Sequence, residues 1–144
     1  MLAQSLEAYE LFIYALPDDN PSIKWSTLVV IRQASDVATV EGEIIFHSGL
    51  RLQMMEVVRF DLIPPRLSRY GYEVWHSNTK LYWYDSQSHP DDPTLASTHP
   101  HHKHIPPDIK HHRVPAPGLS FTKPNLPFLI REIEQLGAAD EHSA

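Results

Sequence analysis

The residues best suited to chemistry lie in one segment, STHPHHKHIPPDIKHHRVPAPG, from Ser97 to Gly118, which holds six of the ten histidines of this 144-residue chain. Four of the six form the run HPHHKH, together with Lys103. An imidazole has a pKa of about 6.5 and exchanges protons near neutral pH. Metal-free cleavage of an RNA phosphodiester needs such groups: a base for the ribose 2′-hydroxyl, an acid for the leaving 5′-oxygen and a cation beside the phosphate.

The same run has a spacing typical of metal ligands. Histidines two residues apart point to one side of an extended segment. This spacing occurs twice, in the pairs His99/His101 and His102/His104. A carboxylate ligand would come from Asp85, Asp108 or Glu56. Zinc requires three or four ligands that are themselves held by hydrogen bonds, so the spacing leaves metal binding and proton transfer both open.

Charge is unevenly distributed along the chain. A formal net charge of -6 argues against a protein that binds nucleic acid over its whole surface, because such binding depends on Lys and Arg contacts to phosphate. From residue 99 to 124, however, four cations accompany one carboxylate: Lys103, Lys110, Arg113 and Lys123 with Asp108. This basic segment is also compatible with a non-catalytic arm that docks on an acidic partner, or with a plain solvated loop.

Other functional classes lack their residues. The chain has no cysteine, no glycine-rich phosphate loop, no G-x-S-x-G motif and no H-E-x-x-H motif, which excludes thiol nucleophiles, disulfides and the common zinc-protease helix. The beginning, MLAQSLEAYELF, has early acidic residues and no long apolar run. We therefore expect neither a signal peptide nor a membrane span, and a cytoplasmic protein without a membrane partner.

The flanking segments predict the scaffold that positions these residues. Apolar residues at helical spacing predict a helix over about residues 4–15, ended by Pro17. Five runs rich in β-branched and aromatic residues then predict strands with short connections, hence an antiparallel meander. The runs are STLVVIRQ, ATVEGEIIFHS, LRLQMMEVVRFDL, LSRYGYEVWHS and KLYWYDS.

The last third of the chain predicts an irregular arm and a helix. Residues 89–127 hold nine of the 13 prolines, too many for an interior strand or helix, but also apolar residues that would anchor an ordered arm on the sheet. Asn125 is the expected N-cap of a final helix, Gly137 its stop, and residues 137–144 a frayed tail. The whole, residues 1–144, predicts one α+β domain.

The third predicted strand contains one unexpected carboxylate. Its even positions, from Leu50 to Leu62, are apolar except for Glu56. A β-bulge near Met54 and Met55 would turn Glu56 back to solvent. The alternative is a partly desolvated carboxylate with a raised pKa beneath a site.

The order of these motifs resembles the TumE family, the toxin half of type II toxin–antitoxin modules. The resemblance is carried by YWYDSQSHP, then HPHHKHIPPDIK, then a short helix. Tyr84 and Asp85 match the family pattern, Ser86 replaces an asparagine, and His89 precedes Pro90 rather than following it. The resemblance implies growth inhibition, a cognate helix-turn-helix antitoxin, and signature positions at Asp85, His101, His102, Lys103 and His104.

Together these observations predict an endoribonuclease that needs no cofactor and acts on RNA. His101, His102 or His104 would serve as acid and base. Asp85 would orient an imidazole, and Lys103 and Arg69 would hold phosphate; Glu56 and Arg69 enter from strand parity and charge rather than from the resemblance. Two alternatives stay open: a metal-dependent hydrolase or nuclease in which a divalent ion is held by the same histidines, and a non-enzymatic binder that inhibits by occupancy.

Overall fold

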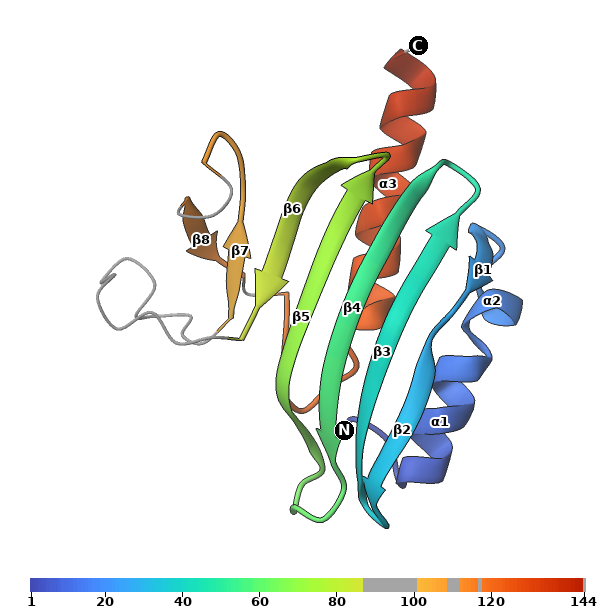
Figure 1. Ribbon diagram of the computed structural model, residues 1–144, viewed down its shortest axis with the longest axis vertical. Helices are drawn as coiled ribbons and strands as arrows, with labels where there is room; N and C mark the ends of the chain where they lie inside the picture. The colour runs from blue at the N-terminus through green and yellow to red at the C-terminus, as the bar shows by residue number, and fades with distance from the viewer. Residues whose placement is uncertain (87–100, 109–111, 117, 144) are drawn as a thin grey trace.

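A computed structural model describes residues 1–86, 101–108, 112–116 and 118–143 of the protein. Over these residues the chain forms an antiparallel sheet of eight strands and three helices (Figure 1). The helices are α1 (Leu6–Tyr14), α2 (Leu16–Asp19) and α3 (Leu126–Ser143). The strands are β1 (Ile23–Ser26), β2 (Val29–Ala34), β3 (Val37–Phe46), β4 (Leu50–Arg59), β5 (Arg66–His76), β6 (Thr79–Asp85), β7 (His102–His104) and β8 (Arg113–Pro115).

The sheet runs in the order β1, β3, β4, β5, β6, β7, β8, and β2 also pairs with β3. β1 and β2 occupy different halves of β3, and the chain passes between them beside Gly42. A Cβ at Gly42 would lie only 2.7 Å from the backbone oxygen of Thr27, and its φ of +138° is a conformation that glycine adopts without strain. Glycine at this position therefore allows the strand switch.

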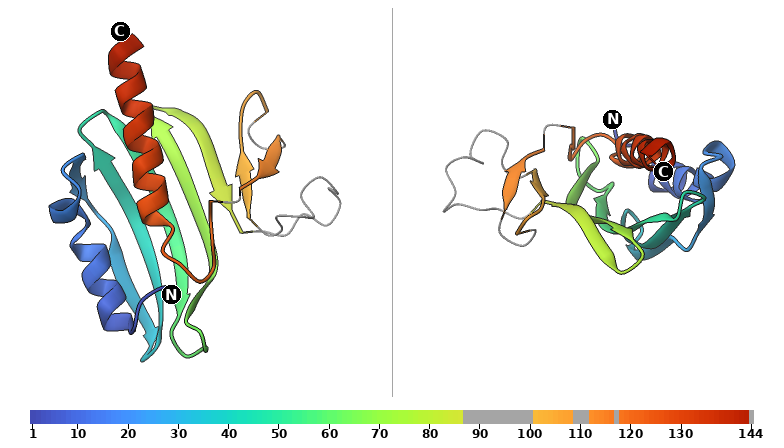
Figure 2. Two further views of the ribbon diagram at one scale, coloured as in Figure 1. Left: turned by 180° about the vertical axis from the view of Figure 1, so that it is seen from behind. Right: turned by 90° about the horizontal axis from the view of Figure 1, so that it is seen from above.

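The sheet curves around two helices, α1 and α3. α1 and α3 lie on the same face, which we call the inner face, and the opposite face is the outer face (Figure 2). Even-numbered side chains of β4 are buried on the inner side, as the alternating pattern predicts. The helices supply apolar side chains to the same core, among them Leu6, Tyr9, Ile13, Leu126, Leu129, Ile130 and Ile133.

The predicted α+β fold, with an antiparallel sheet between an N-terminal and a C-terminal helix, is confirmed, but it has more strands than expected. The five predicted runs correspond to β2 through β6, and β1 is separate. The arm predicted to be irregular adds β7 and β8. β7 contains no proline, and β8 ends the strand order, where Pro115 removes no hydrogen bond from an interior strand.

Two local signals at the helix ends behave differently from expectation. Pro17 lies in the first turn of α2 rather than after the end of a single helix. Asn125 accepts the first helical hydrogen bond through its backbone oxygen, from Leu129 N at 3.1 Å. Its side chain, however, turns away to Ser120 and to the Tyr72 hydroxyl, at 2.8 to 3.1 Å. Asn125 therefore joins the arm to the core.

The predicted end of the last helix at Gly137 is wrong, because α3 continues to Ser143. Gly137 is buried against the β3–β4 turn, and a Cβ there would lie 2.9 Å from the Cβ of Ser48. Such close approach of a helix to a turn excludes a larger side chain. The glycine therefore serves packing rather than termination.

Replacing Gly137 by alanine is expected to lower the free energy of unfolding by about 1 kcal/mol. An exposed helical glycine would gain about 1 kcal/mol from this change, and the clash with Ser48 outweighs that gain. Urea unfolding of Gly137→Ala, Ser48→Gly and the double variant measures the coupling between the two positions, expected at about 1–2 kcal/mol. A stabilised Gly137→Ala single variant would contradict the packing role.

Candidate functional site

The outer face of β6, β7 and β8 brings together three of the predicted site residues. Directly opposed side chains of antiparallel strands point to the same face, and Trp83 is opposite His104 while Asp85 is opposite His102. Asp85 in turn is opposite Gly71 of β5, which has no side chain to cover it. We call Asp85, His102 and His104 the imidazole–carboxylate cluster.

In this cluster one carboxylate contacts two imidazoles. His104 Nε2 donates to Asp85 Oδ2 at 3.2 Å, and His102 Nδ1 lies 3.8 Å from Asp85 Oδ1. All three residues are buried, His102 completely and Asp85 to 7% exposure. A buried carboxylate needs compensating partners, and His104 supplies one through this hydrogen bond. Trp83 stacks on His104 with ring centroids 3.8 Å apart, which fixes the plane of that imidazole.

Two arginines share the outer face with the cluster. Arg113 of β8 is opposite His104 across the last strand pair and is half-buried. Arg69, predicted from its charge, is exposed on β5 two residues from Gly71, a distance of about 7 Å along a strand. Sequence reasoning counted Arg113 only in the local charge. The pairing of β7 with β8 places it opposite His104 on the outer face.

Lys103 lies on the opposite face from His102 and His104, because successive side chains of a strand alternate. Its Nζ is 3.6 Å from Glu132 of α3, and it lies over the rings of Tyr82 and Tyr84, at 4.3 and 5.3 Å from their centroids. The Tyr84 hydroxyl donates to the same Glu132 carboxylate at 2.9 Å. Lys103 therefore joins β7 to α3 through Glu132, which sequence reasoning did not identify.

His101 precedes β7 and contacts the inner-face aromatic residues. It shares a hydrogen bond with the Tyr70 hydroxyl, and the two rings are parallel with centroids 5.8 Å apart. Its ring centroid is also 4.6 Å from that of Phe121. Burial and the negative charge of Asp85 raise the pKa of Tyr70, so the phenol stays protonated. His99, the other member of its predicted pair, lies outside the described residues.

Glu56 lies in the core, apart from the histidines. The predicted bulge at Met54 and Met55 is wrong, since the β3–β4 register is regular there. Tyr9 and Tyr72 each donate to the Glu56 carboxylate at 2.5 Å, and the residue is fully buried. Burial raises the pKa of Glu56, and the two hydroxyl hydrogen bonds partly oppose the shift. The alternative prediction of a desolvated carboxylate is confirmed for the burial of Glu56. Its location beneath a functional site stays a prediction.

Replacing Glu56 by glutamine is expected to reduce the pH dependence of stability. A carboxyl group whose pKa is higher in the folded chain costs stability as the pH rises from its ordinary value near 4.5 through the folded pKa. Glutamine keeps two polar atoms for Tyr9 and Tyr72 but does not ionise. Urea unfolding at pH 5 and pH 8 should therefore show a smaller loss of stability in Glu56→Gln than in the wild type. The exposed control Glu41→Gln should keep the wild-type loss; an unchanged loss in Glu56→Gln would contradict the prediction.

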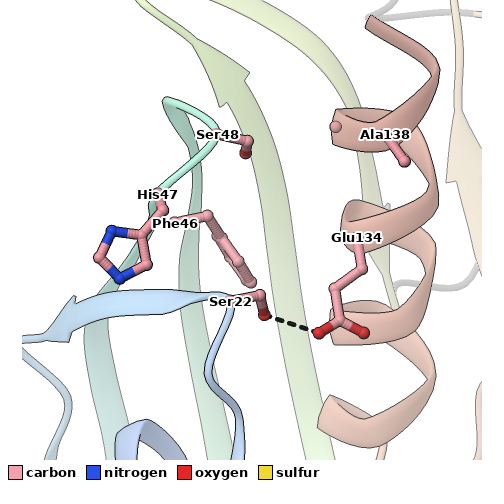
Figure 3. A pocket seen from close by; sticks show the side chains of 7 residues that line it. Ser22, Phe46, His47, Ser48, Glu134 and Ala138 are labelled. Carbon is pink, nitrogen blue, oxygen red and sulfur yellow. Dashed lines mark hydrogen bonds between the residues drawn. The ribbon is translucent and has the colours of Figure 1, made fainter. Parts of the chain in front are cut away.

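Outside the cluster, we considered metal ligands, membrane-spanning helices and cavities in the described part of the chain. No group of three or more His, Cys, Asp or Glu side chains there is arranged to hold a metal ion, and no helix there is long and apolar enough to cross a membrane. A cavity of about 310 Å³ lies between α3 and the β3–β4 turn (Figure 3). Ser22 Oγ donates to Glu134 across it at 2.7 Å. None of its described lining residues belongs to the arm.

Comparison with known families gives a match over most of the chain. The family model described as Toxin TumE matches residues 15–137, which include all the strands and most of α3. Comparisons with curated proteins and with solved structures gave no match. The matched span contains the whole imidazole–carboxylate cluster, and the chain belongs to the TumE toxin family.

Proposed function

We propose that this toxin inhibits growth by cleaving RNA without a metal, with the imidazole–carboxylate cluster as its catalytic centre. The observation that carries the proposal is the single Asp85 carboxylate between two imidazoles, with arginines on the same face. A carboxylate that fixes the orientation of an imidazole is the arrangement by which a histidine becomes an effective general base. Trp83 and Arg113 are half-buried and lie opposite His104 on either side, where they suit a stacked base and a phosphate.

The proposed reaction is a transesterification. One imidazole of His102 and His104 removes the proton of the ribose 2′-hydroxyl, and the 2′-oxygen forms a bond to phosphorus. The bond from phosphorus to the 5′-oxygen breaks, and the other imidazole, in its protonated form, gives that oxygen its proton. The products are a 2′,3′-cyclic phosphate and a 5′-hydroxyl end. Arg113 and Arg69 stabilise the charge that develops on the phosphate oxygens.

The position of Lys103 changes its proposed role. Because it pairs with Glu132 on the inner face, we assign it the task of holding β7 against α3 rather than of binding phosphate. His101, which directly precedes β7, is held in the same way by its hydrogen bond to Tyr70 of β5. Both residues thus position the strand that carries His102 and His104.

Membership in a toxin family also implies an antitoxin partner. We propose that this antitoxin is a DNA-binding helix-turn-helix protein, as the resemblance to the toxins of type II modules implies. Such a partner would neutralise the toxin by binding it directly.

A second function, inhibition by occupancy without catalysis, is favoured by one observation. His102 and His104 have exposed fractions of 0% and 2%, so neither imidazole is open to solvent in this conformation. In this alternative the cluster holds β7 in place, and the arm itself binds the target. The two functions predict different fates for cellular RNA.

Total RNA from cells that express the protein distinguishes these functions. Cleavage predicts fragmented RNA with the wild type and intact RNA with His104→Gln, while the exposed control His47→Gln should behave as the wild type. Growth inhibition with intact RNA would support occupancy instead. Cleavage by the purified protein that EDTA abolishes, and that one divalent ion restores, would support the metal-dependent alternative.

A further inference from the structure

Two adjoining cavities form a groove on the outer face of the sheet. One, of about 460 Å³, lies over β2, β3 and β4, and the other, of about 170 Å³, over β4, β5 and β6. They share three lining residues, Gln53, Met54 and Met55, so they join at β4. α1 and α3 lie on the inner face and leave this groove open in the described part of the chain (Figure 2).

The groove leads to the imidazole–carboxylate cluster. One row of opposed residues crosses the sheet on the outer face, each opposite the next: Glu43, Gln53, Glu73, Trp83, His104 and Arg113. A second row runs beside it: Val29, Glu41, Met55, Gly71, Asp85 and His102. Adjacent strands are about 4.8 Å apart, so the groove centre at Gln53 lies three strands, about 14 Å, from His104.

The described lining of the groove is apolar and acidic. Val29, Met55 and Trp83 supply apolar surface, and three carboxylates accompany them: Glu41, Glu43 and Glu73. Arg51 pairs with Glu43 at 3.2 Å, and Lys80 pairs with Glu73 at 3.6 Å and lies over the Trp83 ring, 5.2 Å from its centroid. Glu41 is exposed and forms no ion pair with the described residues. Three carboxylates and the two cations beside them therefore leave one net negative charge at the groove, at Glu41.

We infer that the groove binds a segment of the antitoxin that presents a lysine or arginine between apolar side chains. The cation meets the three carboxylates around Gln53, and the apolar side chains cover Met55 and Trp83. Such complementarity favours a cationic peptide and disfavours RNA, whose phosphates the same carboxylates repel. A segment that reaches Trp83 also covers the ring that stacks on His104, which blocks approach to the cluster. This inference rests on the proposed antitoxin partner but not on RNA cleavage.

Two substitutions at Gln53 test the groove with opposite signs. Gln53 is exposed and lies between Glu43 and Glu73 on neighbouring strands, so a lysine there pairs within the sheet and preserves the fold. Gln53→Lys should weaken antitoxin binding about tenfold or more, because it places a cation where the partner's cation binds. Gln53→Glu should bind at least as tightly as the wild type. The control Asp18→Lys makes a charge reversal on α2, outside the groove.

The probe is the purified antitoxin, identified as the product of the neighbouring gene that restores growth, and its affinity for each toxin variant is measured by calorimetry. Weaker binding by Gln53→Lys alone, with unchanged toxicity in cells that lack the antitoxin, supports the groove. Equal affinities for all variants would overturn it. Tighter binding of a short RNA to Gln53→Lys, with antitoxin affinity unchanged, would assign the groove to RNA and also overturn it. Since binding is measured without cleavage, failure of the ribonuclease proposal leaves this result interpretable.

Discussion

Replacing His104 by glutamine is expected to lower the rate of RNA cleavage by about 10²–10⁴-fold, the usual contribution of one general acid or base. Glutamine keeps a polar group of similar size beside Asp85 and stacked on Trp83, so the fold is preserved. It has no group that titrates near neutral pH. The loss should therefore fall on the chemical step, with kcat reduced and KM for RNA little changed. His102→Gln should have a comparable effect if the two imidazoles are acid and base.

The matched control for these variants is His47→Gln. His47 is exposed in the β3–β4 turn and contributes no atom to the cluster. Circular dichroism and urea unfolding of each variant show whether it is folded. A folded His104→Gln protein that cleaves RNA at the wild-type rate would remove His104 from the mechanism. Full growth inhibition by the His102→Gln/His104→Gln double variant would remove the cluster as a whole.

Replacing Asp85 by asparagine is the second large effect that we expect. Asp85 does not contact the substrate in the proposed mechanism; it positions His104 and compensates the positive charge of an imidazolium. The expected loss in kcat is up to about 10⁴-fold, the cost of the same change of the orienting aspartate in a serine-protease triad. Asparagine cannot favour a protonated imidazole, so the activity of Asp85→Asn should also have a different pH profile.

A purely structural role for Asp85 would give another pattern. In that case Asp85→Asn would lower the free energy of unfolding and the amount of active protein, while the remaining protein would keep the wild-type kcat and pH profile. Asp85→Glu is the conservative test, because it keeps the charge at a slightly different position. Partial recovery of kcat with the wild-type pH profile supports positioning through charge.

The sequence predicted the scaffold and part of the site for physical reasons that the structure makes plain. Period-two alternation placed His102 and His104 on one side, and they do share the outer face. The same alternation places Lys103 on the inner face, whereas the composition of HPHHKH predicts one group of acid, base and cation. The residue types of the run indicate proton transfer. Only the position of each residue in β7 shows which face of the sheet its side chain occupies.

Other parts of the site depend on contacts between distant segments. Arg113 joins the row of His104 through the pairing of β8 with β7, and Glu132 meets Lys103 because α3 lies on the inner face, where Glu132 also accepts from Tyr84 of β6. No local sequence pattern predicts either contact. The high proline content of the arm argues against strands there, and the contact of Glu132 depends on how α3 packs on the sheet. Gly137 likewise has the signature of a helix end, although its role comes from Ser48, 89 positions earlier in the chain. Tertiary packing overrides local signals at these positions.

The most direct test of the account is the analysis of RNA ends produced by the purified protein. A synthetic single-stranded RNA is incubated with wild type, His104→Gln and His47→Gln in the presence of EDTA, and the products are analysed by mass spectrometry. Wild type and His47→Gln should give fragments with a 2′,3′-cyclic phosphate and a 5′-hydroxyl, and RNA incubated with His104→Gln should stay uncut. Intact RNA with a wild-type preparation that still arrests growth, or cleavage that persists in His104→Gln, would contradict it.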